Sequence, residues 1–170
     1  MALSAEITIE EVSPGDAAAR TLLQEWKPEK DLSTFSNDHL YLIACIDGEP
    51  VAVLEGHHDF ASWEHLADYH HIGEEDLGSY ITSLFVKPSH RRRGAADALL
   101  DWFIEDARRQ GSIAVVAWPD EEEVGRAARV ALNRKHGLEF ARVYEDFQEP
   151  WLMVLPLLER PSIGRAAGSS

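Results

Sequence analysis

The residues best suited to chemistry form one short basic segment, residues 91–96, which holds three arginines, a glycine and two alanines. It lies between an apolar run typical of a strand and an amphipathic stretch typical of a helix. The first turn of a helix exposes unpaired N–H groups and about half a positive charge, so it attracts anions. Small residues let a phosphate approach the backbone, and arginines add forked donors. We therefore predict a phosphate site formed by Arg91, Arg92, Arg93, Gly94, Ala95 and Ala96.

This concentration of positive charge suits a ligand that carries several phosphates. A diphosphate and a third phosphate would match the guanidinium groups together with the helix start. Two better-known phosphate loops are excluded, because the chain has neither a GxxxxGK[ST] segment nor a GxGxxG segment after a strand.

Elements on both sides must position the basic segment. Residues 80–86 predict a strand that ends before Pro88, and the apolar residues after the segment recur at helical spacing until Gly111. A buried strand at residues 112–118 follows, and Asp120 is a suitable N-cap for a second helix.

The N-terminal half predicts a strand, a helix and a hairpin. Apolar and polar residues alternate over residues 6–10, and apolar residues recur at helical spacing over 19–26. The apolar runs 40–46 and 51–54 flank an Asp-Gly pair, which tolerates the positive φ angles of a tight turn.

The remaining segments complete the predicted fold. Residues 56–78 are rich in histidine, aromatic and acidic residues, and we expect an insertion there with a short helix around 62–69. Residues 138–144 and 151–155 predict a last pair of strands. The order β-α-β-β-β-α-β-α-β-β predicts an α/β sandwich around a mixed sheet.

Length and composition bound the class of protein. A chain of 170 residues with 45% apolar residues suits one packed domain, expected over residues 1–158, followed by a flexible polar tail at 159–170. The longest apolar runs are too short to span a membrane, and the first residues lack the pattern of a signal peptide. The single cysteine, Cys45, leaves no internal disulfide and is expected to be a small buried residue. These features favour a cytoplasmic protein.

Charge is distributed unevenly along the chain. The net charge of −14 argues against general nucleic-acid binding, which needs a basic surface. Residues 31–86 hold eleven acidic residues and no lysine or arginine, whereas residues 87–137 hold ten basic and eight acidic residues. The first stretch suits either a cationic partner or a well-solvated surface, and the second stretch suits an anionic ligand.

The basic segment also resembles a family signature. Residues 91–96 fit the R/Q-x-x-G-x-G/A pattern of the GNAT superfamily of acyl-CoA N-acyltransferases, and residues 135–138 resemble the K-x-G-F of that family. The predicted element order along residues 5–156 is also similar to that of the family. The resemblance implies a GNAT-like fold, in which a mixed sheet of about seven strands is splayed at the cofactor site and carries helices on both faces.

The resemblance implies acetyl-CoA, or coenzyme A, as the acyl-donor co-substrate. The N–H groups of residues 91–96 would hold its diphosphate. The backbone of Leu84, Phe85 and Val86 would pair with the pantetheine arm as if it were a further strand. The sheet would be splayed between the strands that end at Val86 and Trp118, and the amine acceptor would approach from the opposite side.

The catalytic residues of the family are matched only in part. Its usual general acid is a tyrosine two residues before the lysine of K-x-G-F, where this chain has Asn133. Asparagine cannot give up a proton, but its amide could hydrogen-bond the leaving sulfur. Tyr80, on the strand before the basic segment, is the other candidate, and an asparagine that often contacts pantetheine is replaced by Arg126. Further candidates are Tyr144 and, acting through a water, Glu55, Glu64 and Asp76.

Histidines are concentrated in one stretch, with five of the eight between residues 57 and 71. Adjacent histidines on a strand or helix point apart, and no spacing here matches a zinc pattern. We therefore predict no metal site and expect an acceptor-side loop whose histidines titrate or pack.

Two functions from different classes stay open. The first is an N-acetyltransferase that moves an acetyl or short acyl group from acetyl-CoA to a primary amine of a small, cationic acceptor or of a basic peptide end. The second is a GNAT-fold module that binds acyl-CoA without catalysis, as a sensor or partner protein, which Asn133 favours. We expect neither a nucleic-acid partner nor a membrane partner. A homodimer stays open, since the apolar strand at 151–155 could add to the sheet edge of a partner.

Overall fold

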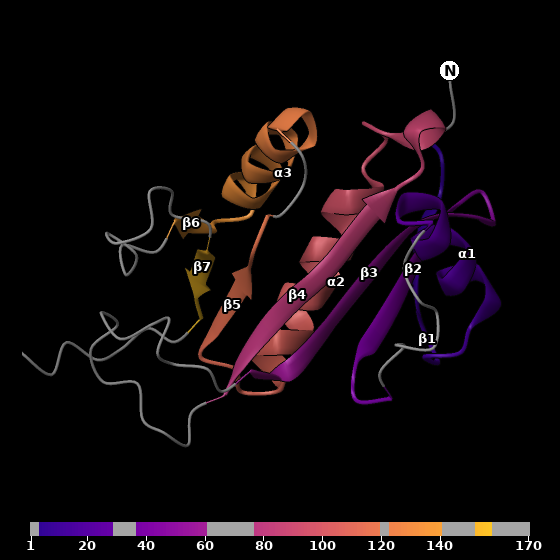
Figure 1. Cartoon of the computed structure of the whole chain (residues 1–170). Helices are drawn as coiled ribbons and strands as arrows, with labels where there is room; N and C mark the ends of the chain where they lie inside the picture. The colour runs from indigo at the N-terminus through magenta and orange to yellow at the C-terminus, as the bar shows by residue number, and fades with distance from the viewer. Residues whose placement is uncertain (1–3, 29–36, 61–76, 120–122, 141–151, 158–170) are drawn as a thin grey trace, which may run out of the picture.

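The computed structural model describes residues 4–28, 37–60, 77–119, 123–140 and 152–157. These residues form a seven-stranded sheet in the order β1-β2-β3-β4-β5-β7-β6, with three α-helices (Figure 1). Neighbouring strands are antiparallel except β4 and β5, which are parallel. The predicted mixed sheet is confirmed.

The order of elements is also the predicted one. In chain order they are β1 (Ile7–Val12), α1 (Ala17–Trp26), β2 (Leu40–Ile46), β3 (Glu49–Phe60), β4 (Gly78–Val86), a single 3₁₀ turn (Pro88–His90), α2 (Ala95–Arg109), β5 (Ala114–Ala117), α3 (Glu123–Lys135), β6 (Glu139–Phe140) and β7 (Met153–Pro156).

The hairpin between β2 and β3 forms at the Asp-Gly pair. Asp47 and Gly48 have φ angles of 50° and 83°, which is the left-handed backbone that a two-residue turn requires. The register of the hairpin shifts between Ala44 and Cys45. Cys45 is half-buried and packs beside the cluster under α1, as its apolar setting predicts.

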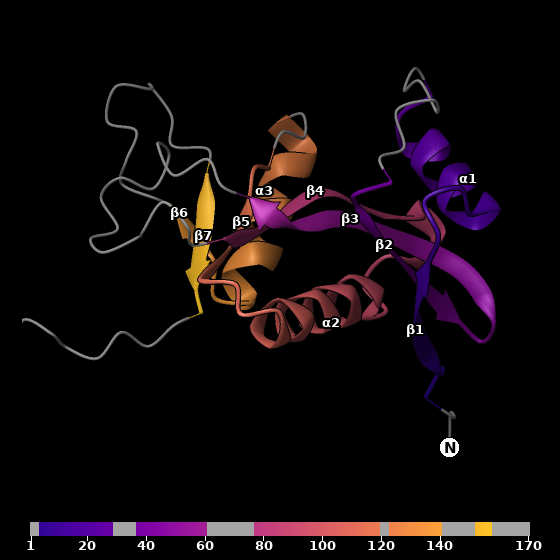
Figure 2. The ribbon, with the colours of Figure 1, turned by 90° about the horizontal axis from the view of Figure 1, so that it is seen from below.

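Two helices cover opposite faces of the sheet (Figure 2). The carboxylate of Asp16 caps α1 by accepting the N–H of Ala19 at 3.1 Å, and α1 buries one apolar stripe against β2, β3 and β4. On the other face, α2 buries the larger core cluster. That cluster is built from Leu42, Leu54, Leu84, Leu99, Leu100 and Phe103, among others.

The sheet splits between β4 and β5, as the family resemblance implies. The two strands pair only from Ser79 to Ile81 on β4 and from Val115 to Ala117 on β5. β5 ends two residues before Pro119, which has no N–H for a ladder, whereas β4 runs on to Val86. The last five residues of β4 therefore border a gap, which Figure 1 shows opening toward α3.

Two predictions for the sheet need correction. The insertion expected over residues 56–78 is too long at its start, because β3 continues to Phe60. A bulge after Glu55 lets the strand continue past Gly56. The strand expected at 151–155 is no sheet edge, since β7 lies between β5 and β6. The helix expected around 62–69 and most of the strand expected at 138–144 lie outside the described residues.

Candidate active site

A cavity of about 1020 Å³ opens where β4 leaves β5. Its walls come from the C-terminal end of α1, the end of β4, the start of α2 and one face of α3. The predicted cofactor residues Leu84, Phe85, Val86, Arg91, Arg92, Gly94, Ala95 and Ala96 all line it. Arg93 is exposed and is not among the lining residues.

The basic segment forms a turn, here called the Gly94 turn (residues 91–94), that leads into α2. Arg92 and Gly94 have φ angles of 63° and 91°, and a Cβ on Gly94 would lie 3.3 Å from the side chain of Ile7. Within the described residues no side chain caps α2, and its first helical bond runs from the N–H of Ala98 to the carbonyl of Gly94. The N–H groups of the first turn are thus left for an anion in the cavity.

The acidic residue in this first turn does not oppose an anion. Asp97 is 2.8 Å from Nε2 of His136 and 3.0 Å from Nζ of Lys135, both at the end of α3. Burial alone would raise the pKa of Asp97, but the hydrogen bonds from His136 and Lys135 outweigh it and hold the pKa below its ordinary value. The carboxylate therefore ties α3 to the start of α2, and its charge is compensated there.

The open edge of β4 presents backbone carbonyls to the cavity. The N–H of Lys87 donates to the carbonyl of Val51 on β3. Because backbone N–H and C=O groups alternate in direction along a strand, those of Leu84 and Val86 point away from β3. Nε of Arg91 donates to the carbonyl of Val86 at 3.3 Å, and Arg129 of α3 donates to that of Leu84. A ligand arm lying along β4 would meet both arginines at these carbonyls.

A second, narrow cavity continues deeper into the split between β4 and β5. Residues from both strands line it, together with Trp26, Trp118, Arg129 and Asn133. Asn133 is only 1% exposed, and its amide Nδ2 lies 3.5 Å from the sulfur of Met153. The residue that replaces the family tyrosine thus lies on the wall of this cavity, with an N–H already directed at a sulfur atom.

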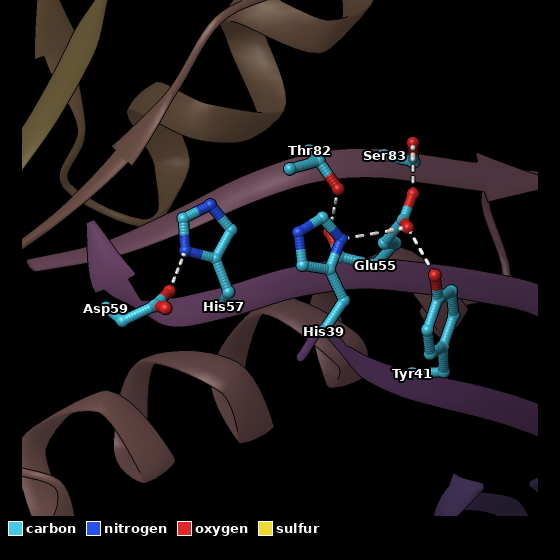
Figure 3. A network of polar contacts seen from close by, with 7 residues as sticks. All are labelled: His39, Tyr41, Glu55, His57, Asp59, Thr82 and Ser83. Carbon is cyan, nitrogen blue, oxygen red and sulfur yellow. Dashed lines mark hydrogen bonds and ion pairs between the residues drawn. The ribbon is translucent and has the colours of Figure 1, made fainter. Parts of the chain in front are cut away.

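Beside this cavity lies a buried carboxylate on β3 (Figure 3). Glu55 is 4% exposed; its Oε2 accepts the hydroxyl of Tyr41 at 2.5 Å and lies 3.1 Å from Nδ1 of His39. The hydroxyl of Ser83 donates to Oε1 at 3.2 Å, and that of Thr82 donates to the backbone carbonyl of Glu55 at 3.0 Å. Because Thr82 and Ser83 also line the narrow cavity, the carboxylate lies one residue behind its wall.

The structure separates the two predicted catalytic residues. Tyr80 lies opposite His57 and stacks on Phe60, with ring centres 5.3 Å apart, and it lines neither cavity. Asn133 lines the narrow cavity, so the two are not brought together. Their catalytic roles stay predictions. Of the further candidates, Glu64, Asp76 and Tyr144 lie outside the described residues.

Several cavity residues had not been predicted. Trp26 and Lys27, at the end of α1, line the larger cavity, and Trp26 and Arg129 line both. Arg129 could have been found from its spacing, because it lies four residues before Asn133 on one face of a helix. The prediction had named Arg126, which does not line either cavity, for this helix. Nothing in the sequence signalled the role of the α1 end.

The histidines of the described region contact separate carboxylates. Nδ1 of His57 is 2.5 Å from Asp59, whereas Nε2 of His58 is 2.8 Å from Asp106 on α2. Among described residues, no three histidine, cysteine, aspartate or glutamate side chains are grouped as a metal would require. His65, His70 and His71 lie outside them.

A mixed sheet that splits beside the uncapped start of a helix is the architecture of a GNAT-type acyl-CoA transferase. A family model for the acetyltransferase (GNAT) family matches residues 6–137, so the chain belongs to that family and is an acyl-CoA N-acyltransferase by class. Among curated protein sequences none matches significantly. In the described region, no helix is both long enough and apolar enough to cross a membrane.

Solved structures share the fold at low sequence identity. The ribosomal-protein-S18-alanine N-acetyltransferase of Escherichia coli is 18% identical, with a TM-score of 0.65 over 92% of this chain and 97% of the other. A GNAT family acetyltransferase from Elizabethkingia anophelis with acetyl-CoA bound is 17% identical, with a TM-score of 0.63 over 89% and 98%. An aminoglycoside acetyltransferase from an uncultured soil sample, in complex with sisomicin, is 16% identical, with a TM-score of 0.56 over 77% and 87%.

Proposed function

We propose that this protein transfers an acetyl group, or another short acyl group, from acetyl-CoA to a primary amine of a small cationic acceptor or of a basic peptide end. The observation that carries the proposal is the cavity of about 1020 Å³ between the open edge of β4, the Gly94 turn and α3. It combines an uncapped helix start with a stretch of β4 that pairs with no strand on its β5 side among the described residues, which suits a ligand that has both phosphates and an extended amide arm.

The residues around the cavity fit acetyl-CoA, which would supply the acyl group as a thioester. The first N–H groups of α2 and the side chain of Arg92 would hold the diphosphate. The backbone of Leu84 and Val86 would take the pantetheine arm, and Arg129 marks the point where this arm reaches the narrow cavity.

Direct transfer needs an amine that has lost its proton and a hydrogen-bond donor for the leaving sulfur. The amide of Asn133 is such a donor on the wall of the narrow cavity. Tyr80 stays the alternative donor, although its ring packs in an aromatic cluster outside both cavities.

The charge of the chain favours a cationic acceptor. Residues 31–86 carry eleven acidic residues and no lysine or arginine. Structural neighbours include one aminoglycoside acetyltransferase and one ribosomal-protein N-acetyltransferase, so the fold accommodates both small polyamines and peptide ends. A cytoplasmic location and a homodimer remain predictions.

The first test is isothermal titration of the native chain with acetyl-CoA, run beside the double variant Arg92→Glu, Gly94→Asp. We expect binding by the native chain and a loss of affinity of at least about 100-fold in the variant, since two carboxylates would face the phosphates. A well-folded native chain that does not bind acetyl-CoA would overturn the proposal.

A panel of amines then tests transfer. Thiol release from acetyl-CoA is followed with spermidine, with sisomicin and with a tripeptide that begins with arginine. Turnover of any one supports the enzyme. Tight binding of acetyl-CoA without thiol release would instead favour the non-catalytic acyl-CoA module, which the asparagine at position 133 keeps open.

A further inference from the structure

The buried carboxylate of Glu55, beside the narrow cavity, contacts one ring nitrogen of His39 and leaves the other ring nitrogen available. Each oxygen of Glu55 has a hydrogen-bond partner within 3.2 Å: Ser83 on Oε1, and both Tyr41 and His39 on Oε2. A carboxylate only accepts hydrogen bonds, so Nδ1 of His39 carries the proton in this contact. The lone pair is then on Nε2, for which the described residues supply no partner.

This arrangement is that of a histidine base oriented by an acid. An acid bonded to one ring nitrogen fixes the tautomer and stabilises the imidazolium that forms when the other nitrogen takes a proton. The side chain of His39 is 26% exposed and that of Glu55 is 5% exposed. Thus one end of the pair is anchored in the sheet, and the other can exchange its proton with solvent.

A neighbouring histidine makes the choice of base specific. His57 stacks on His39, with ring centres 4.9 Å apart, and it has its own carboxylate partner, Asp59. Burial lowers the pKa of His57, although its hydrogen bond to Asp59 opposes this, which makes His57 less ready to take up a proton. Asp59 is 69% exposed at its side chain and is a weaker anchor than Glu55.

We propose that His39 removes the proton from the acceptor amine and that Glu55 is the residue that positions it. The inference rests on the proposed function and adds the base that the sequence could not name. The amine enters as R–NH₃⁺, and one proton passes to Nε2 of His39, directly or through one water. The freed amine attacks the thioester carbon, the C–S bond breaks, and the second proton of the nitrogen passes to the leaving thiolate, while the imidazolium returns its proton to solvent. Among the described residues, the titratable groups that contact this pair include Tyr41 on Glu55 and His57 on His39, and Asp59 contacts His57 in turn.

The test compares His39→Asn with His57→Asn, which is a matched change in the adjacent ring. Thiol release from acetyl-CoA is measured with the three amines of the panel and with water alone. We expect kcat of His39→Asn to fall about 100-fold with an unchanged KM for acetyl-CoA, which is the low end of the range for a general base. His57→Asn should keep kcat within about threefold.

Two further variants separate positioning from packing. Added imidazole should restore part of the rate of His39→Gly, which a purely structural histidine would not allow, and none of the rate of Glu55→Gln. Glu55→Gln should lower kcat about tenfold or more with the same affinity for acetyl-CoA in titration. If His39→Asn does not fold, His39→Gln replaces it.

The outcomes are distinguishable from those that test the proposed function. If kcat of His39→Asn is unchanged, or if kcat falls more in His57→Asn than in His39→Asn, His39 is not the base. The proposed acyl transfer would still stand. If acetyl-CoA binds but no thiol is released with any amine or with water alone, both the proposed acyl transfer and the role of His39 are overturned. Absence of acetyl-CoA binding overturns the cofactor site itself.

Discussion

Two regions of the molecule combine a serine, a histidine and an acid, and they differ in what surrounds them. In the open region, Ser83 lines the narrow cavity and bonds Glu55, which contacts His39 at 3.1 Å. In the closed region, Ser79 is 2.6 Å from Nδ1 of His58, and Nε2 of that ring is 2.8 Å from Asp106.

The closed region connects several elements of the fold. Its serine is fully buried and also bonds Ser112 at 2.6 Å, and the ring of His58 stacks on Phe103 at 5.0 Å. It joins β3, β4, α2 and the segment before β5, and its serine, unlike Ser83 of the open region, lines neither cavity. A serine that no substrate can reach is no nucleophile, so the same three residue types stabilise the fold in one place and suit proton transfer in the other.

The change with the largest expected effect lies between the two regions, at Gly56. A Cβ there would lie 2.7 Å from the ring of Phe103 and 2.7 Å from the carbonyl of Tyr80. Gly56→Ala should therefore cost about 3 kcal/mol of unfolding free energy, measured in urea. Gly15→Ala, where nothing lies within 4 Å, is the control and should stay within about 0.5 kcal/mol. Equal stability of the two variants would contradict the close packing at Gly56.

Removing the closed histidine should separate stability from activity. His58→Ala leaves Ser79 and Asp106 without a shared partner, so we expect a loss of about 2 kcal/mol with kcat changed less than about threefold. His39→Ala should do the reverse, with about 1 kcal/mol lost and most of the activity gone. Urea unfolding and thiol release on the same samples measure both. A large loss of kcat in a folded His58→Ala protein would contradict the division between the regions.

A change on the opposite wall of the narrow cavity tests the donor for the leaving sulfur. Asn133→Leu keeps the branched shape and removes the amide, so kcat should fall about tenfold, the equivalent of about 1.4 kcal/mol. Arg134→Lys, at the adjacent exposed position of α3, lines neither cavity; it is the control and should leave kcat nearly unchanged. If Asn133→Leu is as fast as the native chain, the donor lies elsewhere and Tyr80 becomes the residue to test.

The smallest expected effect is a pH dependence from the open region. The folded-state pKa of His57 is lowered, chiefly by burial, so the unfolded chain binds its proton first as the pH falls. This contribution to stability is present above about pH 6.5 and is lost as the pH falls toward the folded-state pKa. His57→Asn should therefore lose less stability than the native chain between pH 7 and 5, as read from unfolding curves. Identical pH profiles would contradict it.

Local signals were sufficient for most of the fold. The Asp-Gly turn, the alternation in β1 and the glycine before α2 each depend on neighbouring residues, and each formed as predicted. The residues proposed to hold the phosphates could be grouped for the same reason, because they form one continuous segment, and all except Arg93 line the larger cavity. The predicted end of β3 was too early, because the residues at its true end are polar. The bulge after Glu55 that lets β3 continue depends on pairing with β4.

The contacts between His39, Glu55 and Ser83 could not be predicted in this way. His39, Glu55 and Ser83 come from three separate segments, and only the register of β2, β3 and β4 brings them together (Figure 3). Arg129 and the end of α1 reach the cavity through helix packing, which a linear pattern does not encode. Asn133 was named as a departure from the family, and its place in the cavity follows from the fold.

The edge of the sheet formed by β1 has a consequence for self-association. An exposed edge strand offers unpaired N–H and C=O groups to any second copy, which is the usual start of ordered aggregation. Here the edge strand carries exposed carboxylates at Glu10 and Glu11. Two copies that meet along β1 would bring these like charges together, so the strand carries its own barrier to stacking, which acid or high salt would weaken.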